Sequence, residues 1–272
     1  MTDTINYQGV KPSFDMGRVM NRSFSGLFKN IKPILLATLI CLVVSNVLSA
    51  PLLFMDASDP TALTQSPAYW IMTAISSLLG FLFFMFICIF TDYFAFASFT
   101  NSQVRFKNVF FKSLKLTLPL LFIVILYFIS TYIGMIFLIV PGVIISVGWA
   151  IIGPSYLHED TSLFGSFGRS WQLTSGYKWW VWLATIVMGI LMTVMFTVLI
   201  LIMAGVGVSG LAGADMLASS SVRPLLFIFG LLASLFMYLM FALYASFITA
   251  LYTELRELKE GPLGETMGAI FD

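Results

Sequence analysis

The chain has 272 residues, of which 59% are hydrophobic and only 10% are charged, and its net charge is +1. A soluble domain carries about 25% charged residues, so this composition excludes an ordinary water-soluble protein. The near-zero net charge also gives no general attraction to nucleic acid. We therefore expect an integral membrane protein that has the lipid bilayer as its surroundings.

Six apolar segments follow one another along the chain and predict membrane-spanning helices. A helix needs about 20 residues to cross a bilayer, and long continuous apolar runs exclude the alternating pattern of a β-barrel. The expected fold is all-α, a polytopic transmembrane bundle of six spans. One membrane domain is expected over 14–260, between flexible tails at 1–13 and 261–272. The expected spans are 34–54, 70–98, 116–139, 142–157, 180–205 and 224–253.

Three short amphipathic stretches precede the first, third and fifth spans. They cover residues 14–29, 104–115 and 161–174, and each places apolar side chains on one helical face and basic residues on another. This pattern predicts helices that lie in the headgroup layer, and the alternative is solvated loops whose aromatic residues pack on the bundle. For the third stretch, Asp160 or Thr161 is the expected N-cap.

Basic residues fall on one side of the spans. Thirteen of the fourteen Lys and Arg residues lie in alternate connections or beside them, which predicts that both termini are cytoplasmic. We expect these residues to form a basic collar that binds anionic phospholipid headgroups or a protein partner of unknown identity. Its candidate residues are Arg18, Arg22, Lys29, Lys112, Lys115, Arg169 and Lys178.

Short sequence matches suggest an internal repeat. Arg22-Ser23-Phe24 and Arg169-Ser170-Trp171 lie 147 residues apart. One interpretation is three parallel hairpins, at 14–100, 104–158 and 161–255, each beginning with an interfacial helix. The other is chance, because apolar sequences match one another easily.

Two polar residues within the spans are candidates for a functional role. Asp92 lies near the cytoplasmic end of the second span, where it can extend to the membrane interface, pair with Lys32 or Arg105, or serve a proton or a substrate. Asn46, beside Ser45, is expected to bond across helices.

A second polar cluster, His158-Glu159-Asp160, is expected to begin a helix. Glu159 is expected to form an ion pair with Arg169 or Arg22. A metal site would need more ligands than this sole histidine offers, so neither a metal nor another cofactor is expected.

One stretch of the chain resembles a known group of proteins. Its residues are Pro141-Gly142, Pro154, Glu159 and Arg169-Ser170, in that order. The stretch is similar to bacterial six-span inner-membrane proteins of unknown function, which are related to the membrane domain of glycerophosphodiester phosphodiesterases. The resemblance implies a location in the bacterial inner membrane but no activity, since the phosphodiesterase chemistry belongs to a separate soluble domain.

Independently of this resemblance, Pro141-Gly142 is expected to form the outer turn of the middle hairpin, because proline lacks the N–H that a helix needs and glycine permits unusual dihedrals.

The expected function is non-enzymatic, because the sequence offers no catalytic triad and no phosphate-binding loop. The first hypothesis is an accessory or organising role in membrane, envelope or lipid homeostasis through the basic collar. The alternative is a transporter or permease for a lipid or another apolar solute, with Asp92 and Asn46 lining a mid-membrane cavity. Assembly with further copies of the chain is compatible with both hypotheses.

Overall fold

In the computed structural model of the chain, residues 13–53, 66–159, 161–211 and 223–261 are described, and these ranges contain helices and no β-strand. Five helices in these ranges are long and apolar enough to cross a membrane, or six if the bent pair at the start counts as one span. The expected all-α polytopic bundle is thereby confirmed. The tails expected at 1–13 and 261–272 lie almost wholly outside the described residues.

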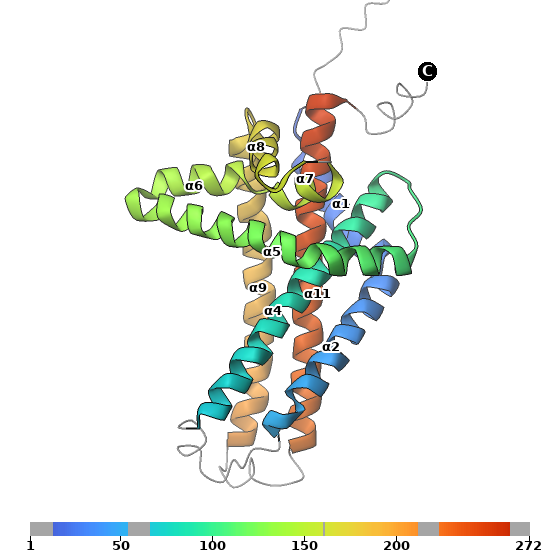
Figure 1. The fold of residues 1–272 in the computed structure, drawn as a ribbon, viewed down its shortest axis with the longest axis vertical. Coiled ribbons are helices and arrows are strands. Elements are labelled where there is room, and N and C mark those ends of the chain that lie inside the picture. The colour runs from blue at the N-terminus through green and yellow to red at the C-terminus, as the bar shows by residue number, and fades with distance from the viewer. Residues whose placement is uncertain (1–12, 54–65, 160, 212–222, 262–272) are drawn as a thin grey trace, which may run out of the picture.

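Four long helices share one end of the molecule, the lower one in Figure 1. They are α2 (Ile31–Leu53), α4 (Pro67–Phe99), α9 (Lys178–Leu211) and α11 (Arg223–Glu260). At the opposite end, the short helices α1 (Met16–Lys29), α7 (Ile152–His158) and α8 (Leu163–Thr174) gather around the C-terminal part of α11 (Figure 1). We call it the basic end, because Arg18, Arg22 and Arg169 lie there.

Helices α1 and α8 confirm two of the three expected amphipathic helices. Each begins with a side-chain cap: Asp15 accepts a hydrogen bond from the backbone of Arg18, and Ser162 accepts one from Gly165. The cap of α8 is therefore Ser162 and not Asp160 or Thr161, because the Ser162 hydroxyl lies three residues before a free helical N–H.

The chain bends by 66° between α1 and α2. Asn30 occupies the bend, and its side-chain amide donates to the carbonyl of Gly26 (2.8 Å), to Ser98 Oγ (2.6 Å) and to the carbonyl of Phe94 (3.2 Å). These bonds fix the bend against α4.

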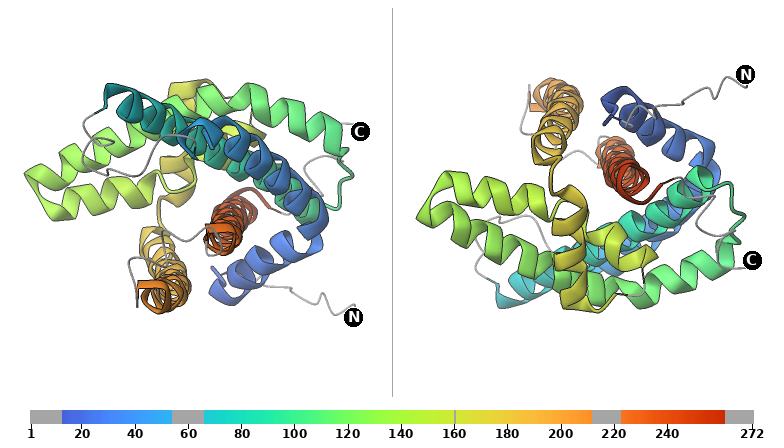
Figure 2. Two further views of the ribbon diagram at one scale, coloured as in Figure 1. Left: turned by 90° about the horizontal axis from the view of Figure 1, so that it is seen from below. Right: turned by 90° about the horizontal axis from the view of Figure 1, so that it is seen from above.

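The middle of the chain departs from the expected hairpin. Helix α5 (Phe106–Phe137) is continuous, so residues 106–115 of the predicted stretch form its first turns and not a separate interfacial helix. No glycine or proline interrupts this segment before Pro119, so the helix runs on. Together α5 and α6 (Ile139–Gly148) extend across the direction of α9 and α11 (Figures 1 and 2).

The turn of this hairpin lies at Leu138, not at Pro141-Gly142 as expected from the sequence. Pro141 falls in the first turn of α6, where a missing N–H costs nothing. Gly142 lets the two helices approach, since a Cβ atom there would lie 2.7 Å from the backbone nitrogen of Met135.

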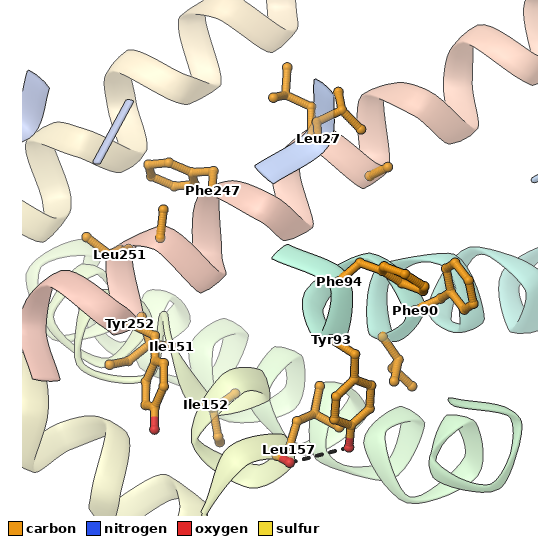
Figure 3. Close-up of a cluster of buried hydrophobic side chains, with 14 of the residues drawn as sticks. Leu27, Phe90, Tyr93, Phe94, Ile151, Ile152, Leu157, Phe247, Leu251 and Tyr252 are labelled. Atoms are coloured by element: carbon orange, nitrogen blue, oxygen red, sulfur yellow. Dashed lines mark hydrogen bonds between the residues drawn. The ribbon is translucent and has the colours of Figure 1, made fainter. Parts of the chain in front are cut away.

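A continuous apolar core joins the basic end to the bundle. Leu27 of α1, Phe90 and Phe94 of α4, Leu157 of α7 and Phe247 of α11 all belong to it (Figure 3). The core thus holds α1 and α7 against the long helices, and Leu173 of α8 also belongs to it, which excludes solvated loops at 14–29 and 161–174.

The helix positions agree with repetition of the outer segments. Helices α1 and α8 begin 147 residues apart, as do α2 and α9, and the caps Asp15 and Ser162 keep the same offset. The proposed middle copy at 104–158 lacks the separate first helix. A repeat of the outer segments stays a prediction.

Candidate functional site

A cavity of about 480 Å³ lies between α4, α5, α6, α7, α9 and α11. Its size is within the roughly 300–1,000 Å³ typical of pockets for small molecules. Most of its lining is apolar or aromatic, with contributions from every one of these helices, for example Phe84, Leu120, Val147, Pro154, Trp182 and Ile248. An apolar chain therefore fits this space better than a hydrated polar solute.

Asp92 is the charged side chain in the lining, and it is 4% exposed. Its Oδ2 lies 2.5 Å from Nε2 of His158, and its Oδ1 accepts a hydrogen bond from the hydroxyl of Thr249. The sequence prediction that Asp92 pairs with Lys32 or Arg105 is wrong. Helix α7 brings a histidine 66 residues further along the chain to the carboxylate, and neither basic residue contacts it.

Aromatic rings hold His158 in place. Its imidazole stacks on Phe96 with ring centroids 3.8 Å apart and meets Tyr93 edge-on at 5.4 Å. The hydroxyl of Tyr93 in turn donates to the carbonyl of Leu157 (3.3 Å; Figure 3). The sequence predicted that His158 begins a helix. The one signal for a partner of Asp92 was that His158 is the sole histidine of the chain.

Asn46, the second predicted intramembrane candidate, does not join Asp92. Its amide donates to the carbonyl of Leu42 within its own helix (2.8 Å), and the residue is not part of the cavity lining. The expectation of a bond from Asn46 across helices is wrong for the described residues, because the carbonyl one turn earlier is the nearer acceptor.

Hydroxyl groups in the cavity wall are bonded in the same local way. Ser146 Oγ donates to the carbonyl of Val143, and Thr185 Oγ1 donates to that of Val181, each at 2.8 Å. Their hydrogens are therefore directed at their own helices, and their oxygen atoms remain able to accept.

At the basic end, carboxylates of α11 hold two of the predicted collar arginines. Glu254 is 1% exposed and lies 3.2 Å from Arg18 Nε and 3.5 Å from Arg22. Arg22 also pairs with Glu257 at 2.9 Å. Helix α1 covers this part of α11, so Glu254 is buried, whereas Lys259 and Glu260 at the helix end are exposed.

Arg169 of α8 is held in the same manner. Its Nε lies 2.5 Å from Glu159 Oε2, which confirms the predicted ion pair, and Glu260 binds the other edge of the guanidinium. Burial lowers the pKa of Arg169, but the hydrogen bonds and charges of Glu159 and Glu260 raise it by more, so the group remains cationic. The other oxygen of Glu159 accepts from Tyr252 (2.8 Å).

The two remaining residues of the predicted motif also lie at helix contacts. Ser170 Oγ donates to the carbonyl of Gly148 at 3.0 Å and so ties α8 to α6. Pro154 lies in the first turn of α7, just after the break between α6 and α7. The motif therefore contributes to the packing of α6, α7 and α8 and to the cavity wall.

The collar lysines, in contrast, have no carboxylate within ion-pair distance among the described residues. Lys112 lies over the ring of Tyr93 at 4.6 Å, and Lys178 lies over that of Trp171 at 3.1 Å. Further exposed cations without such a partner in the described ranges are Lys29, Lys32, Arg105, Lys107, Lys115 and Lys259, the last of which donates to the carbonyl of Gln172. The predicted collar thus divides into paired arginines and a largely unpaired set of lysines.

The described residues contain no group of three or more His, Cys, Asp or Glu side chains that could hold a metal ion. No protein-family model, curated protein or solved structure matches the chain. The site is therefore interpreted from its own geometry.

Proposed function

We propose that this protein binds the apolar chain of a membrane molecule in the cavity and acts in lipid homeostasis, as a carrier or accessory protein and not as an enzyme. The observation that supports the proposal is the cavity of about 480 Å³ with its apolar lining from six helices. Burial of an apolar chain is favourable by about 0.8 kcal/mol for each methylene group removed from water. Within a bilayer this gain is smaller, so shape and the polar group at Asp92 decide which molecule binds.

The proposed location is the bacterial inner membrane, with both termini in the cytoplasm. The asymmetric distribution of basic residues supports this orientation, because Lys and Arg accumulate on the cytoplasmic side. The resemblance of residues 141–170 to bacterial inner-membrane proteins supports the inner membrane as the location. Reporter fusions at residues 60, 103 and 215 and at the C-terminus test the orientation.

Ligand binding is tested with a variant in which a larger side chain fills part of the cavity. Gly153 is part of the lining, and a Cβ atom built on it would meet no heavy atom within 4 Å. The exchange Gly153→Leu therefore adds a side chain to the cavity wall, and its Cβ atom meets no neighbour. Gly189→Leu is the matched control, because a Cβ atom at Gly189 also meets nothing, and Gly189 is exposed outside the cavity.

Both variants and the natural protein are reconstituted in phosphatidylcholine nanodiscs with a long-chain alcohol that carries a photoreactive diazirine. We expect labelling of cavity peptides in the natural protein and in Gly189→Leu. In Gly153→Leu this labelling should fall roughly tenfold, since overlap with a methyl-sized group costs about 1–3 kcal/mol. Equal labelling of all three proteins would contradict the proposal.

A second candidate function rests on the lysines that have no acidic partner. These exposed side chains, among them Lys29, Lys112 and Lys115, can attract anionic phospholipid, each contributing about 1 kcal/mol near a charged membrane surface. Such a surface would give the protein an organising role in the membrane. Simultaneous Lys→Gln exchange at these three positions should reduce the phosphatidylglycerol that co-purifies with the protein, as measured by mass spectrometry. An unchanged lipid content would exclude this role.

A further inference from the structure

The geometry points to a cavity that selects an amphiphile whose polar end donates hydrogen bonds and carries no negative charge, namely a hydroxyl or an amine, with Asp92 as its acceptor. This inference rests on the proposed function, because it names the class of molecule that the same cavity binds. It is carried by the charges and by the hydrogen-bond directions of the lining.

The charge of the lining disfavours anions. Asp92 is its charged side chain, and no lysine or arginine belongs to it. Asp92 is paired with His158, whose side chain is also buried, so the basic ring beside the carboxylate is already engaged. A carboxylate or phosphate in the cavity would lose its hydration and find no cation in return, which is strongly unfavourable.

Free hydrogen-bonding capacity at Asp92 favours a donor. A carboxylate has about four lone-pair positions. One bond from His158 and one from Thr249 use two of them and fix the orientation of the group. The remaining positions can accept from a ligand, and an ammonium or hydroxyl is the matching partner.

The neighbouring wall adds further acceptors. Because Ser146 and Thr185 donate to their own helices, each offers only its oxygen lone pairs to the cavity. Tyr127 and Tyr244 add hydroxyls that can donate as well as accept. A hydroxyl or a neutral amine can use both kinds of wall group, whereas a carboxylate can use only the donors.

The test compares four photoreactive chains of equal length in phosphatidylcholine nanodiscs. Their ends are a hydroxyl, a primary amine, a carboxylate and a methyl group, and labelling of cavity peptides is quantified by mass spectrometry. In the natural protein we expect the hydroxyl and amine to label most strongly and the carboxylate least. A preference of roughly tenfold over the carboxylate corresponds to about 1.4 kcal/mol.

The variant Asp92→Asn keeps the shape of the side chain and removes its charge. We expect it to lose the preference for the amine over the carboxylate and to retain binding of the hydroxyl. The ranking in the natural protein needs no variant, so it decides the inference even if Asp92→Asn is unstable.

Two outcomes separate this inference from the proposed function. If all four chains label the cavity equally, or if the carboxylate labels best, selection by Asp92 is refuted while binding of an apolar chain stands. If none of the chains labels cavity peptides, the proposed function fails, and this inference fails with it.

Discussion

The exchange Glu254→Gln tests whether one buried carboxylate attaches α1 to the bundle. Glu254 accepts a hydrogen bond from the backbone of Asp15 (3.2 Å), next to the first turn of α1, and faces Arg18 and Arg22 of that helix. Glutamine retains the shape and can still accept from Asp15. Only the charge that faces the two arginines is lost.

The expected cost follows from the exposure of the partners. Arg18 is 43% exposed, so solvent screens its interaction, and Arg22 retains Glu257 at 2.9 Å. Glu254 Oε2 lies within ion-pair distance of both arginines but makes no hydrogen bond to them, so the loss is that of a buried charge facing two cations. Because Arg22 keeps a partner, we expect about 2 kcal/mol of stability, less than the roughly 3–5 kcal/mol for breaking a fully buried pair. For a chain of this size such a loss lowers the unfolding temperature by about 5 °C.

The assay combines thermal unfolding in detergent with hydrogen exchange of α1. We expect faster exchange in residues 16–29 and unchanged exchange in α9, which does not depend on Glu254. Glu257→Gln is the matched control: its side chain is 23% exposed and binds Arg22 alone, through both oxygens, so we expect a smaller loss of about 1 kcal/mol. Equal losses in the two variants, or an α1 that exchanges as before in Glu254→Gln, would refute the reasoning.

Three further changes test other contacts. Gly142→Ala should cost about 1–3 kcal/mol in thermal unfolding, because the new Cβ atom meets the backbone of Met135, whereas Gly80→Ala, where a Cβ meets nothing, should cost nothing. Asn30→Ala should cost about 1–3 kcal/mol and speed exchange at the bend between α1 and α2, because two carbonyls and Ser98 lose their donor. Arg169→Lys should loosen α8 and expose it to limited proteolysis, since an ammonium cannot bind Glu159 and Glu260 as the guanidinium fork does; intact protection of α8 would contradict this.

Much of the fold could be predicted from the sequence because local patterns determine it. Long apolar runs require helices in a membrane, and the spacing of apolar residues in 14–29 and 161–174 gave α1 and α8 within two residues of their observed starts. The ion pair of Glu159 with Arg169 was also predictable, since the two residues are ten positions apart and flank a helix start. Each of these features depends on residues that are near one another in the chain.

The remaining features depend on contacts that no local pattern encodes. Hydropathy reports that α5 tolerates an apolar environment, but it does not report the direction of the helix, which depends on its contacts with α4 and α6. The pairing of Asp92 with His158 joins α4 to α7 across 66 residues. Glu254 follows an apolar segment and so resembles a solvated helix end, and only the arrival of α1 buries it.

The division of the basic collar has a physical basis in the two kinds of cation. A guanidinium presents several donors in a rigid plane and is weakly hydrated, so it can be shared between two carboxylates within a protein, as Arg22 and Arg169 are. An ammonium is strongly hydrated and remains at the surface, as Lys29 and Lys115 do. Equal charges in the sequence therefore have different surroundings: Arg22 and Arg169 lie between carboxylates, whereas Lys29 and Lys115 are exposed. Neutralising the arginines should thus lower the unfolding temperature, and neutralising the lysines should change the bound lipid without doing so. The two effects can be separated in one set of purified variants.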